Sequence, residues 1–198
     1  MNKMMIGWGV AGVVLAGGLI AGCKTSRAGY GSAPYKVVRQ ADKFELRDYP
    51  ALRLVETAMG SRGDSGSGSF GRLFGYISGK NAAEEKIAMT TPVFMSGAEA
   101  NATMAFVMPA EMEAAKVPQP TDQAVRVREV QGGRFAVLRF SGGRSGKKEA
   151  AALKQLEGWM KQEGLQSTGS GPVYGYFDPP WTPGFLRRNE VMWRVAQP

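Results

Sequence analysis

The sequence lacks histidine entirely and has a single cysteine, Cys23, in 198 residues. Without histidine, the usual general base, the Ser–His and Cys–His nucleophile systems and the commonest metal ligand are all missing. One cysteine excludes an internal disulfide and any cysteine-based zinc site. These absences remove most hydrolase and metalloenzyme mechanisms and leave general acid–base work by Glu or Asp open, and we expect no metal site in the protein itself.

Long blocks of like charge are also missing, although 25 Lys and Arg outnumber 17 Asp and Glu. Scattered positive charge favours solubility and mild attraction to anionic surfaces, not a nucleic-acid-binding stripe. We therefore expect no nucleic-acid partner. The apolar share of 43% is ordinary for a globular protein, so most of the chain should fold.

The first 22 residues have the pattern of a signal peptide, with a basic start and an apolar run over residues 6–20. The segment LIAGC, which ends at Cys23, resembles the lipobox of bacterial lipoproteins, and this predicts cleavage before Cys23 and its acylation. An uncleaved membrane anchor is the alternative. Because Lys24 is not the aspartate of an inner-membrane retention signal, we expect a lipid-anchored protein of the bacterial cell envelope, at the outer membrane and facing the periplasm.

The rest of the chain divides into a tether and a domain. Residues 23–34 are polar and rich in Gly and Ser, which predicts a flexible tether, and residues 35–198 are expected to form the folded domain. Apolar residues at i, i+3, i+4 and i+7 predict a helix over residues 70–78, and a second helix is predicted over residues 147–163. Strands are predicted at residues 44–49, 52–57, 87–91, 93–96, 103–108, 125–130, 135–140, 173–177 and 191–195.

The order strand, Gly-rich loop, helix, strand, strand thus occurs twice. We predict an α+β fold in which the two β-α-β-β repeats pair as a pseudo-two-fold distorted β-barrel with two flanking helices. A cleft is expected where the halves meet.

Three short motifs carry little weight. Residues 66–71 match G-x-G-x-x-G but lack the preceding strand and the βαβ unit of a dinucleotide site. Residues 63–66 resemble a serine-protease nucleophile segment, yet Ser65 has no histidine to act as its base. Glu84 and Glu85 form a carboxylate pair beside Lys86, a pattern more typical of a solvated turn.

Residues 178–191 hold three prolines and a glycine within seven positions, and also carry Trp181 and Phe185. Such a run forms neither a helix nor a central strand. It predicts a rigid aromatic loop that either walls a pocket or plugs the core. The methionines of the first half have two similar interpretations, as core filler or as adaptable pocket lining.

Three segments together resemble the SOUL/haem-binding-protein family. They are the opening residues 35–50, which include FELRDYP (44–50), the central motifs FGRLFGYISGKN (70–81) and EKIAMTTPV (85–93), and the tail DPPWTPGFLRRNEV (178–191). The match spans about residues 35–195. Family members are pseudo-symmetric distorted β-barrels that bind haem or other tetrapyrroles in an apolar cleft, generally without catalysis.

Together with the predicted lipid anchor, the resemblance implies a membrane-tethered binding protein, not an enzyme, for haem, another tetrapyrrole or a similar planar hydrophobic ligand. Its cleft would comprise Phe70, Leu73, Phe74, Ile77, Met89, Trp181 and Phe185, and propionates would pair with Arg72, Lys80, Arg187 or Arg188. Without histidine, the ligand would be held by apolar burial and charge pairing, with no usual ligand for iron. An envelope structural protein that has lost ligand binding, or an enzyme that uses a carboxylate on a hydrophobic substrate, are the alternatives.

Overall fold

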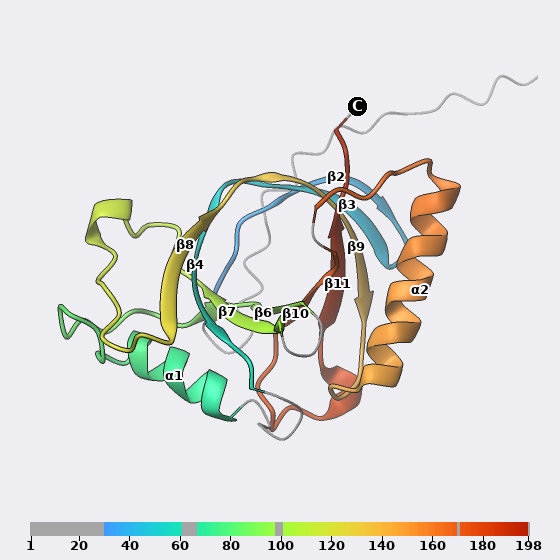
Figure 1. The fold of residues 1–198 in the computed structure, drawn as a ribbon. Coiled ribbons are helices and arrows are strands. Elements are labelled where there is room, and N and C mark those ends of the chain that lie inside the picture. Colours follow the sequence, from blue (N-terminus) through green and yellow to red (C-terminus); the bar gives the residue numbers. More distant parts are fainter. Residues whose placement is uncertain (1–29, 61–66, 98–100, 170, 198) are drawn as a thin grey trace, which may run out of the picture.

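A computed structural model describes residues 30–60, 67–97, 101–169 and 171–197 of the chain. Within these residues, nine strands form one antiparallel sheet in the order β2-β3-β9-β11-β10-β6-β7-β4-β8 (Figure 1). The strands are β2 (Lys36–Ala41), β3 (Phe44–Tyr49), β4 (Leu52–Ala58), β6 (Val93–Ser96), β7 (Thr103–Val107), β8 (Val125–Val130), β9 (Gly133–Phe140), β10 (Val173–Tyr176) and β11 (Asn189–Arg194).

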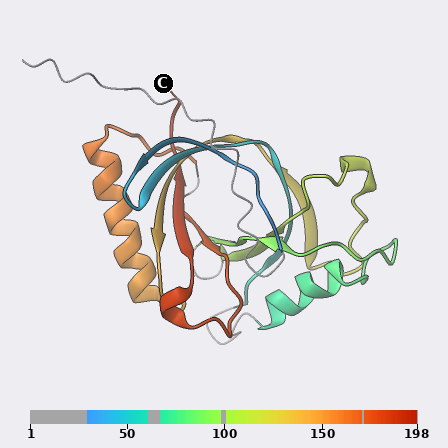
Figure 2. The same cartoon turned by 180° about the vertical axis from the view of Figure 1, so that it is seen from behind.

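Two helices, α1 (Ser67–Ile77) and α2 (Gly146–Gln162), lie on the outer side of the curled sheet (Figures 1 and 2). Helix α1 packs against β4 and β7, and α2 packs against β9 and β11. A small parallel pair joins β1 (Gly31–Ser32) to β5 (Thr90–Thr91). Two short 3-10 helices, η2 (Ala114–Lys116) and η3 (Gly184–Leu186), lie in connecting loops.

The two repeats lie symmetrically in the sheet about the β10–β6 pair. Outward from this pair, the first repeat (β4-α1-β6-β7) contributes β6, β7 and β4. The second repeat (β9-α2-β10-β11) contributes the equivalent strands β10, β11 and β9 on the other side. The α+β class with two helices is therefore confirmed. No pairing between the described strands joins the edges β2 and β8, so the closed barrel stays a prediction.

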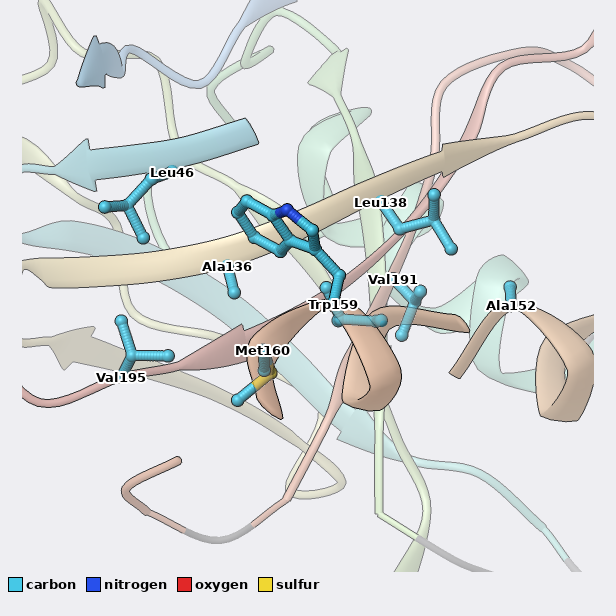
Figure 3. Close-up of a cluster of buried hydrophobic side chains, with 9 residues drawn as sticks. Leu46, Ala136, Leu138, Ala152, Trp159, Met160, Val191 and Val195 are labelled. Carbon is cyan, nitrogen blue, oxygen red and sulfur yellow. The ribbon is translucent and has the colours of Figure 1, made fainter. Parts of the chain in front are cut away.

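The outer face of the sheet holds two apolar clusters, one beneath each helix. Under α2, the indole of Trp159 stacks on Phe44 of β3 with ring centroids 5.1 Å apart, among Leu46, Ala136 and Leu138 (Figure 3). The cluster under α1 comprises Val55, Leu73, Tyr76, Ile77, Ile87, Met104, Phe106, Met108 and Val125. Each large apolar side chain buried in this way contributes about 1.5–3 kcal/mol.

The inner face of the sheet is also buried, which the alternating pattern of residues 44–49 did not predict. That pattern predicts a half-buried strand, but both Glu45 and Arg47 of β3 are fully buried. The sheet curls round (Figure 1), so its inner face is enclosed by other strands instead of facing water. A third apolar cluster, which includes Phe94, Val137 and Met192, fills another part of this face.

The described fold includes residues ahead of residue 35. Gly31 and Ser32 pair with β5, and Ala33 is buried in the inner cluster. All three clusters are made of residues 33–195. The predicted strand over residues 87–91 is reduced to β5. The predicted signal peptide, Cys23, most of the predicted tether and Ser65 lie outside the described residues.

Candidate ligand-binding site

Helix α1 presents an exposed aromatic pair to the solvent. Phe70 and Phe74 are one helical turn apart and remain 40% and 50% exposed, and their rings stack with centroids 5.9 Å apart and an interplanar angle of 13°. Phe70 also contacts Phe106 edge-on, which ties the pair to the core. Leu73 and Ile77 belong to the same stripe of the helix but are buried. The apolar stripe predicted from the sequence is therefore shared between the core and the surface.

A groove of about 260 Å³ lies on another flank of the helix, between α1 and the segment that leads into β8, and neither phenylalanine lines it. Gly71 and Gly75, each one residue after a phenylalanine of the pair, form part of the helix side of the groove. A side chain at residue 71 would project into open space, because no neighbouring atom lies within 4 Å of the point where its Cβ would stand. The lining residues are Gly71, Arg72, Gly75, Tyr76, Lys80, Pro120, Thr121, Asp122 and Val125.

Lys80 is placed at the groove by the way α1 ends. Gly79 has a φ of +109°, a conformation that glycine adopts at little cost. This turn lets the backbone N–H of Lys80 donate to the carbonyl of Gly75 at 2.9 Å, and the Lys80 stem then lies over Gly75. Thr121 donates its hydroxyl to the Lys80 carbonyl at 3.0 Å, which joins the two walls. The predicted C-cap at Gly79 therefore positions one cation of the site.

Arg72 supplies the second cation. Its Nε donates to Thr57 Oγ1 at 3.0 Å and its Nη2 donates to the Ala58 carbonyl at 2.8 Å, so the guanidinium is fixed against the end of β4. Asp122 is the one carboxylate among the lining residues, and it accepts the backbone N–H of Ala124. The lining thus carries two cations and one anion, which favours an anionic ligand group.

Tyr76 lines the groove as a neutral hydroxyl. The side chain is buried, and its OH donates to the Pro118 carbonyl at 2.7 Å. Burial, together with the charge of Glu85, raises the pKa of Tyr76 to about 12. A phenolate is therefore disfavoured here, and Tyr76 is poorly suited to bind iron.

The other residues of the predicted cleft lie elsewhere. Met89 is half-buried against the cluster under α1, whereas Trp181 and Phe185 are 78% and 79% exposed on the loop between β10 and β11. Among the described contacts, none joins either aromatic side chain to α1. The structure brings Phe70, Phe74, Arg72 and Lys80 to one helix and its C-terminal turn, and the ligand roles of the remaining residues stay predictions.

The predicted propionate partners in the tail already have intramolecular partners. Arg187 donates from Nε to the Thr182 carbonyl at 2.7 Å and from Nη2 to the Pro180 carbonyl. Arg188 donates from Nη2 to Glu190 at 2.5 Å, and its guanidinium lies 4.1 Å from the centre of the Phe177 ring. Both arginines therefore hold the loop and the inner face of the sheet.

The inner face contains a buried ion network that sequence reasoning missed. Arg47 donates two hydrogen bonds to Glu190 at 2.7 and 2.9 Å and one to Glu45 at 2.6 Å. Arg139 pairs with Glu45 at 2.5 Å. Burial alone would raise the pKa of Glu190, but the hydrogen bonds and charges of Arg47 and Arg188 outweigh it and hold that pKa below its ordinary value. The sequence signal for this network was the spacing of Glu45 and Arg47, which are two residues apart and so lie on the same face of β3.

A second hollow, of about 100 Å³, opens on the inner face of the sheet. Its walls are mostly apolar, and its polar residues include Glu56 and Arg128, which are paired at 2.6 Å. This volume is too small for a tetrapyrrole. The groove beside α1 is therefore the better candidate.

Metal-binding clusters and membrane-spanning helices are both missing from the part of the chain that the structure describes. These residues contain no group of three or more histidine, cysteine, aspartate or glutamate side chains that could hold a metal ion. They also contain no helix with both the length and the hydropathy needed to cross a membrane.

The chain folds as a two-repeat α+β domain whose first helix carries an exposed pair of aromatic rings. The model of the SOUL heme-binding protein family matches residues 30–194, and the chain belongs to this family. Heme-binding protein 2 of Mus musculus is 30% identical over 174 residues, which cover 83% of each chain.

Solved structures agree on the fold alone. The EcmrR C-terminal domain has a TM-score of 0.54 at 14% identity, over 83% of this chain and 99% of that one. A structure described as a hydrolase from Listeria innocua has a TM-score of 0.58 at 11% identity, over 80% and 94%. Identities this low support the shared architecture and carry no argument about chemistry.

Proposed function

We propose that this protein binds haem, another tetrapyrrole or a similar planar amphiphile on the exposed face of α1. The observation that carries the proposal is that α1 bears both the exposed Phe70–Phe74 pair and, on another flank, one wall of a groove that contains Arg72 and Lys80. A planar apolar ligand would cover the two rings, and its carboxylates would reach the two cations. Membership of a haem-binding family and the similarity to Heme-binding protein 2 support this ligand class.

The residues at the site suit the porphyrin plane and its carboxylates better than they suit iron. The aromatic pair offers an apolar face, and each cation can form charge-assisted hydrogen bonds with a propionate. In contrast, the sequence has no histidine, and the hydroxyl of Tyr76 is a neutral donor to Pro118. The proposed binding mode therefore does not require the metal.

We propose further that the role is non-catalytic. The buried carboxylates Glu45, Glu56 and Glu190 are each paired with an arginine, and none of them lines the groove. The lowered pKa of Glu190 keeps that group ionised, which does not favour a role as a proton donor. These observations support binding over the carboxylate-enzyme alternative.

The proposal also includes a membrane tether. Acylation at Cys23 would hold the domain at the envelope, in the periplasm-facing position that the sequence predicts. Stable attachment is expected because each buried methylene of a lipid chain contributes about 0.8 kcal/mol. Labelling with a radioactive fatty acid that disappears in Cys23→Ser would support the anchor, and labelling that persists would contradict it.

The site is tested by titrating metal-free protoporphyrin into residues 24–198, a chain that contains every described element. The double variant Phe70→Ser/Phe74→Ser should weaken binding by at least about tenfold, and Lys80→Glu should weaken it by about fivefold. The matched control Val37→Ser/Val38→Ser removes two apolar side chains with similar exposure from the edge strand β2 and should leave the affinity unchanged. No saturable binding by the unaltered chain would favour the structural alternative.

The contribution of the loop between β10 and β11 to ligand binding can be tested separately from that of α1. As a rim of the site, Trp181 and Phe185 would contact a ligand that lies on α1, so Trp181→Ala should lower porphyrin affinity without altering the free energy of unfolding. An unchanged affinity would limit the site to α1 and its groove.

A further inference from the structure

The loop between β10 and β11 carries three large apolar side chains on its surface. Trp181 and Phe185 are about four-fifths exposed, and Leu186 is 55% exposed. Single exposed apolar residues are common on proteins, but three within six positions are not. We call residues 180–187 the aromatic tip.

The backbone of the aromatic tip is braced from inside. The guanidinium of Arg187 caps the carbonyls of Pro180 and Thr182, and the N–H of Gly142 donates to the Gly184 carbonyl at 2.9 Å. Pro179, Pro180 and Pro183 restrict the chain further. Because the backbone is fixed, the aromatic side chains can enter an apolar medium with little additional loss of conformational entropy.

Exposed basic side chains surround the aromatic tip. Gly184 packs against Gly142 and Gly143, which lead directly into the start of α2 (Figure 2). The exposed residues Arg144, Lys147 and Lys148 follow, and the Nζ of Lys148 lies over Gly142.

The nearby acidic groups are engaged. Glu149 accepts a hydrogen bond from the Tyr176 hydroxyl at 2.7 Å and its carboxylate lies 3.8 Å from the Nε of Arg144, and Asp178 accepts the backbone N–H of Arg188 at 2.6 Å. Lysines in the first turn of a helix also oppose the helix dipole, so local helix stability does not explain them. Arg144 offsets the charge of Glu149, and the exposed Lys147 and Lys148 leave an excess of positive charge beside the tip.

We propose that the aromatic tip inserts into the headgroup region of an anionic lipid bilayer, with Arg144, Lys147 and Lys148 against the lipid phosphates. Tryptophan is favoured at this depth because its ring is apolar while its N–H can still reach water or a phosphate. Basic side chains near the surface add electrostatic attraction to anionic lipids. A second copy of the chain is a poorer partner, because a symmetric contact would bring two identical positive clusters together.

The test uses residues 24–198 without porphyrin, and vesicles of phosphatidylcholine either alone or mixed with phosphatidylglycerol. The unaltered chain should sediment with the mixed vesicles and not with the neutral ones. Trp181 is much more exposed than Trp159 or Trp193, so vesicle addition should shift tryptophan emission to shorter wavelength. Brominated lipids should quench this emission, a readout that needs no variant, and Trp181→Phe should abolish the shift.

Two pairs of variants separate the apolar and charged parts. Trp181→Ser/Phe185→Ser should lower vesicle partitioning by at least about tenfold, while Val37→Ser/Val38→Ser should not change it. Lys147→Glu/Lys148→Glu should lower it similarly, while Lys154→Glu/Lys161→Glu, an equal charge change farther along α2, should retain most of the binding. All the altered side chains are on the surface, so thermal unfolding should be nearly unchanged.

Several results would overturn the proposal. These are equal partitioning of the unaltered chain and the tip variant, equal losses in the two lysine pairs, or an absence of binding to mixed vesicles. Self-association in the absence of lipid that is lost in Trp181→Ser/Phe185→Ser would assign the tip to a second copy. None of these readouts involves porphyrin, so their outcome is independent of ligand binding at α1.

Discussion

At the scale of single residues, the most consequential feature is the buried pair of Arg47 and Glu190. It joins β3, near the start of the domain, to β11 at its end, and both side chains are fully buried. A buried ion pair adds little net stability compared with an apolar pair, but removing one partner is costly because the other charge remains buried. We therefore treat the pair as a constraint on how the two ends of the chain meet.

Glu190 should make folding stability depend on pH. Its folded-state pKa lies below the ordinary value of 4.5, so the unfolded chain binds more protons between these two values. The stabilisation is therefore present above pH 4.5 and is lost as the pH falls through the folded pKa. Urea unfolding between neutral and acidic pH should show this loss.

The matched variants for this prediction are Glu190→Gln and Glu129→Gln, the second of which alters an exposed residue of β8. Glu190→Gln should lower the free energy of unfolding at pH 7 by about 3 kcal/mol and flatten its decline in acid. Glu129→Gln should change it by less than about 0.5 kcal/mol. If Glu190→Gln kept the full acid dependence, Glu190 would not be its source.

At the scale of elements, two glycines lower the helical stability of α1 and leave its side of the groove open. Gly71 and Gly75 each cost about 1 kcal/mol relative to alanine, yet they line the groove instead of packing against a neighbour in the core. Leucine at residue 71 should therefore raise the melting temperature while filling part of the ligand site.

Gly71→Leu should weaken protoporphyrin binding by at least about fivefold and stabilise the fold by about 0.5–1 kcal/mol. The control is Gly158→Leu on α2, where a side chain also has nothing within 4 Å of its first carbon. It should stabilise the fold similarly and leave binding unchanged. Calorimetry and ligand titration give the two quantities, and unchanged binding in Gly71→Leu would exclude the groove from the site.

Local patterns of sequence predicted the elements well because each element has its own signal. The i, i+3, i+4 stripe located α1, and Gly79 marked its end and so the position of Lys80. The sequence did not predict the burial of side chains where that burial depends on tertiary structure. The burial of Glu45 and Arg47 follows from the curl of the whole sheet, and the outward position of Trp181 and Phe185 follows from hydrogen bonds of Arg187 that no spacing reveals.

At the scale of the whole molecule, the first residues that the structure describes link the two halves. Gly31 and Ser32 pair with β5 in the first repeat, while Tyr35 contacts both Arg47, at 4.1 Å between guanidinium and ring centre, and Arg188 at the tail. A segment whose composition is typical of a tether therefore belongs in part to the fold.

A chain that begins at residue 36 should consequently be less stable than one that begins at residue 30. Loss of the buried Ala33, the Tyr35 ring and its cation–π contact should cost about 2–4 kcal/mol. The midpoint of urea unfolding measures this difference. Equal midpoints would show that residues 30–35 are not part of the cooperative unit.

In the proposed binding mode, α1 holds a planar ligand by its face and its carboxylates, without help from a metal. The most direct measurement is a parallel titration of residues 24–198 with haem and with metal-free protoporphyrin. We expect dissociation constants within about threefold of each other, because apolar contact and charge pairing are common to both ligands. Haem bound at least about thirtyfold more tightly than the metal-free ring would contradict it, since such a gap, about 2 kcal/mol, would require a ligand to the iron.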